Sequence, residues 1–204
     1  MPAAPFRRPA ALDQVDAESI EAPGDIPLDS EVAHASARLL LGHADDTKLA
    51  RLIDVIHDGG VDTVCELWAH SPATTLPGIA WRLYLIDQWG QRDLEQVRQR
   101  YNEGLAAPGV PGVPTPEAIG LDETLAANRA FLAGRLPSEQ LWQLLGRMGA
   151  LLRILATGAS YGDTWITDDA DDLAAHVTRR ASALTRTSDE LLQAGALARA
   201  GRLD

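Results

Sequence analysis

The feature that most constrains the fold is a helical repeat of apolar residues that returns along most of the chain. From residue 29 to 105, and again from 121, apolar side chains recur at spacings of three, four and seven, as on one face of an α-helix. No segment of useful length shows the strict alternation of a half-buried strand. We therefore expect an all-α fold, an irregular bundle of about seven to nine helices.

Proline and glycine divide the chain into a tail, a helical domain and an internal loop. Residues 1–28 carry five prolines and no sustained apolar repeat, so we expect a disordered tail. Residues 106–116 hold four prolines and two glycines, which argues against regular structure. We expect this stretch to be a loop on a single domain of residues 29–204, since each half alone is small for a core. The alternative is a boundary between two subdomains.

Capping and breaking signals predict where individual helices lie and end. The segment 76–89 is apolar on most sides and is therefore expected to be the central, most buried helix. Gly90 is expected to bend or break this helix, and Gly158 to end a later one. Thr187 precedes Glu190 by three residues, the spacing of a capping box, and predicts the start of a C-terminal helix.

The charge balance argues against two classes of partner. The chain has 18 basic and 29 acidic residues, a formal net charge of −11. Nucleic-acid binding needs a cationic surface, and so does binding to anionic membranes.

A lone cysteine, Cys65, cannot form an intramolecular disulfide. With no signal peptide and no long uninterrupted apolar stretch, we expect a cytoplasmic protein.

One short pattern resembles a metal site of helical phosphohydrolases. His57 and Asp58 end an apolar helical stretch, and His34 lies 23 residues upstream. This resembles the His…His-Asp line of the HD-type enzymes, which implies a divalent ion that generates a hydroxide nucleophile. The fourth ligand would be a distant aspartate such as Asp122. The residues after the pair depart from the family, since Gly60 follows where a polar residue is usual.

Two other acidic patterns have simpler explanations. The run from Asp168 to Asp172 fits the magnesium-binding spacing of helical isoprenoid synthases, but aspartates also stabilise a helix start. Glu31 and His34 resemble one of the two ligand pairs of a di-iron bundle, which also needs two further glutamates. We therefore expect no metal and no cofactor.

Aromatic residues gather in the middle of the chain. Trp81, Leu85 and Trp89 lie four residues apart, on one face of the expected central helix. Trp68 is close in sequence, and Arg82 flanks the stripe. The stripe is either a seam of the core or a surface that accepts a partner. We predict a partner surface at Trp68, Trp81, Arg82 and Trp89.

A block of the chain resembles a family without a known activity. Residues 66–68 (ELW), followed by residues 76–85 (LPGIAWRLYL), are similar to a block in uncharacterised helical proteins of high-GC actinobacteria. The block spans about 20 of the 204 residues. The resemblance implies an actinobacterial lineage but no particular activity.

These patterns favour a non-enzymatic protein-interaction or regulatory protein, whose partner is another protein or a second copy of the chain. One alternative is the metal-dependent phosphohydrolase with His34, His57 and Asp58 as ligands. A second alternative is a helical small-molecule sensor, with a pocket lined by Trp81, Tyr84 and Trp142.

Overall fold

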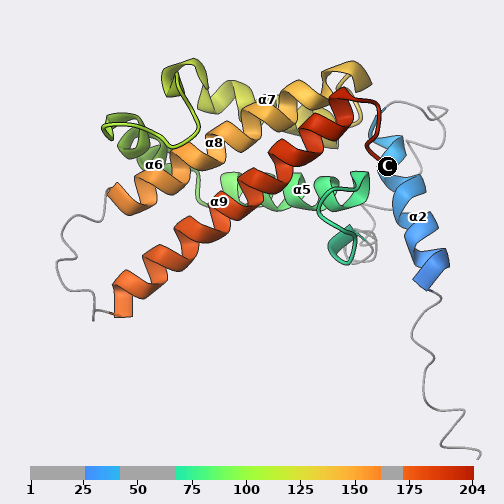
Figure 1. The fold of residues 1–204 in the computed structure, drawn as a ribbon, viewed down its shortest axis with the longest axis horizontal. Helices are drawn as coiled ribbons and strands as arrows, with labels where there is room; N and C mark the ends of the chain where they lie inside the picture. The colour runs from blue at the N-terminus through green and yellow to red at the C-terminus, as the bar shows by residue number, and fades with distance from the viewer. Residues whose placement is uncertain (1–25, 42–67, 162–171) are drawn as a thin grey trace, which may run out of the picture.

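The fold is all-α wherever the structure describes the chain. The computed structural model describes residues 26–41, 68–161 and 172–204 (Figure 1). Apart from an isolated bridge between Val110 and Val113, these residues contain no β-structure. The all-α prediction is confirmed for them, and the total of seven to nine helices stays a prediction. The described helices are α2 (Ile26–Leu39), α5 (Leu76–Arg92), α6 (Leu94–Ala106), α7 (Leu121–Leu132), α8 (Leu141–Tyr161) and α9 (Asp172–Arg199), with short 3₁₀ helices η2 (Pro116–Ala118) and η3 (Ser138–Gln140).

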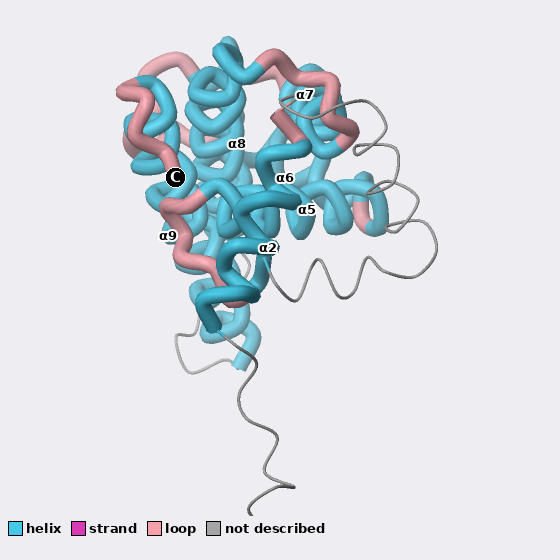
Figure 2. The backbone as a smooth tube through the Cα atoms, turned by 90° about the vertical axis from the view of Figure 1, so that its right-hand side faces the viewer, coloured by secondary structure: helices cyan, strands magenta, loops and turns pink. Residues whose placement is uncertain are grey.

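Helix α8, and not the segment 76–89, occupies the centre of the bundle. It lies against α9 along most of its length and also contacts α6 and α7 (Figures 1 and 2). Six of the large side chains that are fully buried belong to α8, whereas α5 supplies two. The prediction of α5 as the central helix is therefore wrong. Apolarity on most sides indicates burial, and α8 has this property over 21 residues.

Glycines let the central helix approach its neighbours at backbone distance. A Cβ added at Gly158 of α8 would overlap the carbonyl oxygen of Arg100 in α6, and one at Gly104 of α6 would overlap the carbonyl oxygen of Ile154 in α8. Across the α8–α9 contact, a Cβ at Gly149 would lie 2.8 Å from the Leu192 side chain. Because glycine has no Cβ, it allows main chains to approach this closely.

The observed helices correct three expectations about where helices break, end or begin. Gly158 lies inside α8, which continues to Tyr161, and Gly90 lies inside α5, which continues to Arg92. Thr187 lies in the middle of α9, where its hydroxyl donates to the carbonyl of Ala183. Glycine at a helix contact and threonine bonded to the preceding turn are both compatible with a continuing helix when tertiary packing stabilises it.

Two observed element ends lie near residues 28 and 106, and the predicted tail of residues 1–28 lies mostly outside the described residues. Helix α2 begins at Ile26, three residues before the expected domain start, and the proline at residue 27 is compatible with a first helical turn. Between Ala106 and Pro116 the chain forms no helix. Val110 and Val113 of this loop are buried against Ile154 of α8. The main core unites side chains from both sides of the loop.

No helix in the described residues combines the length and the apolar character that a membrane crossing needs.

The glycine contacts generate a stability prediction with an internal control. Gly158→Ala is expected to lower the free energy of unfolding by about 1–3 kcal/mol, the usual cost of overpacking. Gly146 lies in the same helix, and a Cβ added there would meet no atom within 4 Å. Gly146→Ala is therefore expected to raise the free energy of unfolding by about 0.4–1 kcal/mol. Urea denaturation followed by circular dichroism measures both. Equal effects of the two substitutions would contradict the close α6–α8 contact.

Candidate functional site

Trp68, the first residue of the predicted partner surface, belongs to the core. Its side chain is 3% exposed, and its Nε1–H donates to the hydroxyl of Ser36 on α2 at 3.0 Å. Ser36 in turn donates to the carbonyl of Ala33. This chain of hydrogen bonds satisfies the indole N–H in a buried position, so Trp68 joins α2 to the bundle.

Arg82 forms a contact within the protein. Its Nε donates to Oε2 of Glu190 on α9 at 2.6 Å, and its Nη1 donates to the carbonyl of Gly78 at 2.9 Å. Both side chains of the ion pair are mostly buried, with exposures of 20% and 26%. A charge-assisted hydrogen bond at this depth joins α5 to α9, so the positive charge of Arg82 is already matched.

The outward face of α5 carries three neighbouring apolar and aromatic side chains. Trp81 and Tyr84 stack, with ring centroids 5.9 Å apart and an angle of 23° between the rings. Leu85 lies beside them at helical spacing and is 45% exposed. We call Trp81, Tyr84 and Leu85 the aromatic face. It contains one residue of the predicted partner surface, Trp81, which is partly buried against the core, together with Tyr84 and Leu85, which were not in that prediction.

Trp89 belongs to a different surface, a groove between α5, α6 and α9. The groove has a volume of about 520 Å³, within the range of small-ligand sites. Three arginines from three helices line it together with the Trp89 ring, and we call it the arginine groove. Its lining residues are Trp89, Arg92, Asp93, Gln96, Arg100, Arg180, Ala183, Leu184 and Thr187.

A larger groove, about 720 Å³, lies on the other side of α9. Small side chains of α8, α9 and the loop 107–111 form most of its wall. Its cation, Arg153, donates to the carbonyl of Pro111 at 3.1 Å, to Ser188 Oγ at 3.2 Å and to Asp189 Oδ1 at 2.6 Å. Those bonds connect the loop to α9. The arginine groove is smaller, but its cations make it the stronger candidate site.

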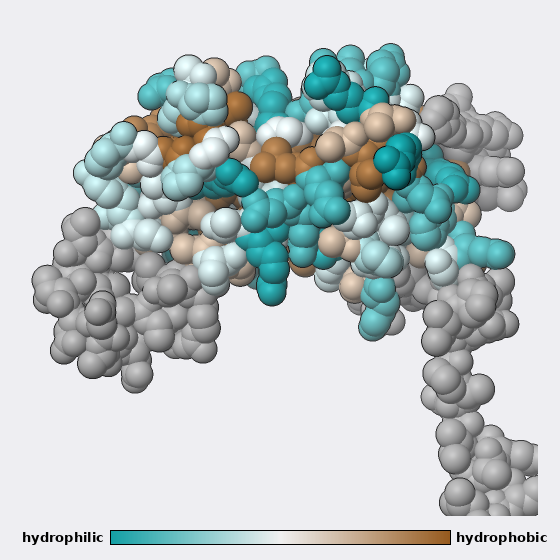
Figure 3. All heavy atoms as spheres, viewed as in Figure 1, coloured by the Kyte–Doolittle hydropathy of each residue, from teal (hydrophilic) through white to brown (hydrophobic). Residues whose placement is uncertain are grey.

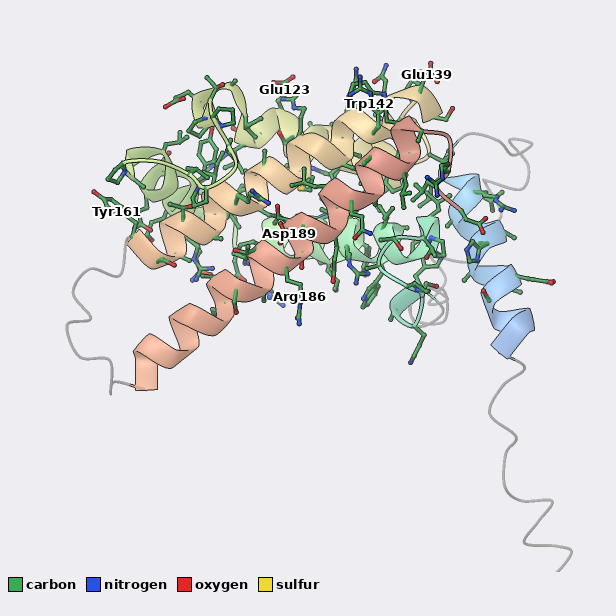
Figure 4. The ribbon with its side chains drawn as sticks, viewed as in Figure 1. Glu123, Glu139, Trp142, Tyr161, Arg186 and Asp189 are labelled. Atoms are coloured by element: carbon green, nitrogen blue, oxygen red, sulfur yellow. The ribbon has the colours of Figure 1, made fainter. Side chains whose placement is uncertain are left out.

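On the face that Figure 3 shows, hydrophobic residues form a band along α8 and α9, with hydrophilic residues on both sides. Trp142, at the start of α8 (Figure 4), is 36% exposed, and the Arg199 guanidinium lies 5.1 Å from its ring centroid. Trp142 lines neither groove, and neither do Trp81 and Tyr84. The sensor pocket predicted from these three aromatics does not coincide with either concavity.

The predicted metal ligands can be followed only in part. His57 and Asp58 lie outside the described residues, as do Asp168 to Asp171. His34 Nδ1 lies 2.8 Å from the carbonyl oxygen of Ser30, one turn earlier on α2. Asp122 pairs with Arg98 at 3.3 Å. Within the described residues no group of three or more potential ligands lies together.

Two ionisable groups of α6 and α7 show shifted pKa values away from either groove. The hydrogen bond from Arg147 lowers the pKa of Glu123, an exposed carboxyl on α7 (Figure 4). Burial raises the pKa of Tyr101 on α6, whose hydroxyl donates to the carbonyl of Ile119 at 2.8 Å. The first contact joins α7 to α8, and the second joins α6 to the segment between η2 and α7.

Comparison with known proteins supplies no relative whose function could be compared with these surfaces. No protein-family model matches the chain, and neither a curated protein nor a solved structure matches it. The aromatic face and the arginine groove are therefore the features that bear on function. The similarity to an actinobacterial block stays a prediction.

The internal role of Arg82 can be measured with a double-mutant cycle. Arg82→Met, Glu190→Gln and the double variant are expected to give a coupling energy of about 1 kcal/mol in urea unfolding, the upper end for partly exposed pairs. The Arg38–Asp204 pair is the control, since its side chains are 59% and 84% exposed. Its coupling is expected to be no more than a few tenths of a kcal/mol. Equal coupling in the two cycles would leave Arg82 available as a partner anchor.

Proposed function

We propose that this chain is a non-enzymatic protein-interaction module of the cytoplasm that self-associates through the aromatic face of α5. The observation that carries the proposal is the exposure of Leu85 beside the Trp81–Tyr84 stack. Aromatic side chains offer a large apolar area with little conformational freedom to lose, which suits a docking surface.

Charge supports a second copy of the chain as the occupant. Copies of a chain with a net charge of −11 repel each other, and the repulsion is weakest when they meet through a surface that lacks acidic side chains. The stretch from Leu76 to Gln88 holds one acidic residue, Asp87, which is 7% exposed and accepts a hydrogen bond from Gln91. This part of α5 therefore presents no exposed acidic side chain of its own over about three turns.

An apolar face without exposed acid is also complementary to itself. In a two-fold dimer each copy presents the same residues to the other, so the stacked rings and Leu85 of one chain would meet those of the second. Each buried Leu85 would contribute about 1.5–3 kcal/mol on the scale of full side-chain burial, and less here because the side chain is already half covered.

Self-association predicts a specific effect of charge at Leu85. The wild-type protein is expected to dimerise at micromolar concentrations, and Leu85→Glu is expected to raise the dimer dissociation constant at least about tenfold, because an unpaired charge would enter an apolar contact. Sedimentation equilibrium measures this constant directly.

Val32→Glu is the matched control for this experiment. Val32 lies on α2 and is 46% exposed, so the substitution makes the same chemical change at nearly the same exposure on another helix. The control is expected to dimerise like the wild type apart from a small electrostatic effect. A wild-type protein that remains monomeric throughout the concentration range would refute self-association, and so would equal losses in the two variants.

A further inference from the structure

The arginine groove concentrates positive charge on an acidic protein. Arg92 comes from the end of α5, Arg100 from α6 and Arg180 from α9, and they share the groove with one acidic residue, Asp93. The chain as a whole carries 29 acidic and 18 basic residues. Bringing three arginines from distant parts of such a chain into one concavity creates a local attraction for anions.

Arg92 and Arg180 keep donor capacity for a ligand. Arg92 pairs with Asp93 through its Nε at 3.2 Å, and 77% of its side chain is exposed, so this pair does not engage the two terminal nitrogens of its guanidinium. Arg180 is exposed on α9. A planar guanidinium donates two parallel hydrogen bonds to a phosphate or carboxylate, which is the geometry such anions prefer.

The first turn of α6 borders the groove, and the carboxylates of Asp93 and Glu95 partly offset the positive potential of its backbone N–H groups. Asp93 and Gln96, at the start of this helix, both line the groove. Asp93 occupies the N-cap position without forming a side-chain capping bond, since its carboxylate accepts from Arg92 instead. The N–H groups of a first helical turn carry partial positive charge and attract anions.

An apolar wall accompanies the cations. Trp89 packs against the core from one side of the groove, and the guanidinium of Arg100 lies 5.8 Å from its ring centroid. Leu184 and Ala183 face the groove from α9. A ligand with a flat apolar portion next to an anionic group would contact both kinds of wall.

We propose that the arginine groove binds a small organic anion, with its phosphate or carboxylate group held by Arg92, Arg100 and Arg180 and its apolar portion against Trp89 and Leu184. The volume of about 520 Å³ suits a small molecule. This proposal is independent of self-association, because none of these residues belongs to the aromatic face.

Calorimetric titration with model anions tests the proposal. Phenyl phosphate and benzoate are the probes. Inorganic phosphate, which lacks an apolar portion, tests the contribution of the apolar wall, and benzyl alcohol, which lacks a charge, tests the contribution of the arginines. At low ionic strength at least one organic anion is expected to bind with a dissociation constant below about 1 mM, and added salt is expected to weaken it. Inorganic phosphate and benzyl alcohol are expected to bind at least about tenfold more weakly. The tighter of the two organic anions identifies the preferred oxyanion.

Matched arginine variants locate the binding. Arg180→Gln and Arg92→Gln are each expected to raise the dissociation constant about tenfold, equivalent to about 1.4 kcal/mol. Arg186→Gln is the control, because Arg186 lies on α9, is exposed and is not part of the groove (Figure 4). Trp89→Phe is expected to abolish any ligand-induced change in tryptophan fluorescence while binding persists. Failure of both organic anions to bind, or an equal loss in Arg186→Gln and Arg180→Gln, would overturn the proposal.

Discussion

Direct contact of helix backbones at glycines is the constraint on which the rest of the structure depends. Gly104 and Gly158 bring α6 against one side of α8, and Gly149 accommodates α9 on another. With α6 and α9 both held close to α8, their remaining faces and the end of α5 enclose the arginine groove. The same closeness buries the leucines of α8 on nearly all sides, which makes this helix the centre of the core.

The helical period predicted the fold class, because apolar spacing reports directly on the buried face of each helix. Which helix is central could not be predicted from apolarity alone, since α5 and α8 both look buried in the sequence. Taken locally, Gly90 and Gly158 indicate a break or an end of a helix, and Thr187 indicates a helix start. All three lie inside continuous helices, because the packing that decides their conformation involves residues distant in sequence.

The candidate surfaces were predictable only in part. The four-residue spacing of Trp81, Leu85 and Trp89 correctly places them on α5, but spacing does not reveal that Trp68 is buried or that Arg82 pairs with Glu190, 108 residues away. No recognisable motif in the sequence marks the arginine groove. Arg92 and Arg100 lie 80 or more residues before Arg180, and only the α6–α8–α9 arrangement brings the three together.

The placement of glycines in α8 has an evolutionary consequence. Gly149 and Gly158 are nine residues apart, and at about 100° per residue this separation puts them on opposite sides of the helix, one toward α9 and one toward α6. Apolar core residues can exchange for one another as sequences diverge, provided that volume is kept. Position 158 and its counterpart 104 have no such freedom, because the space beside them is filled by main-chain atoms that no side-chain exchange removes. In a diverging lineage these glycines would outlast the leucines around them.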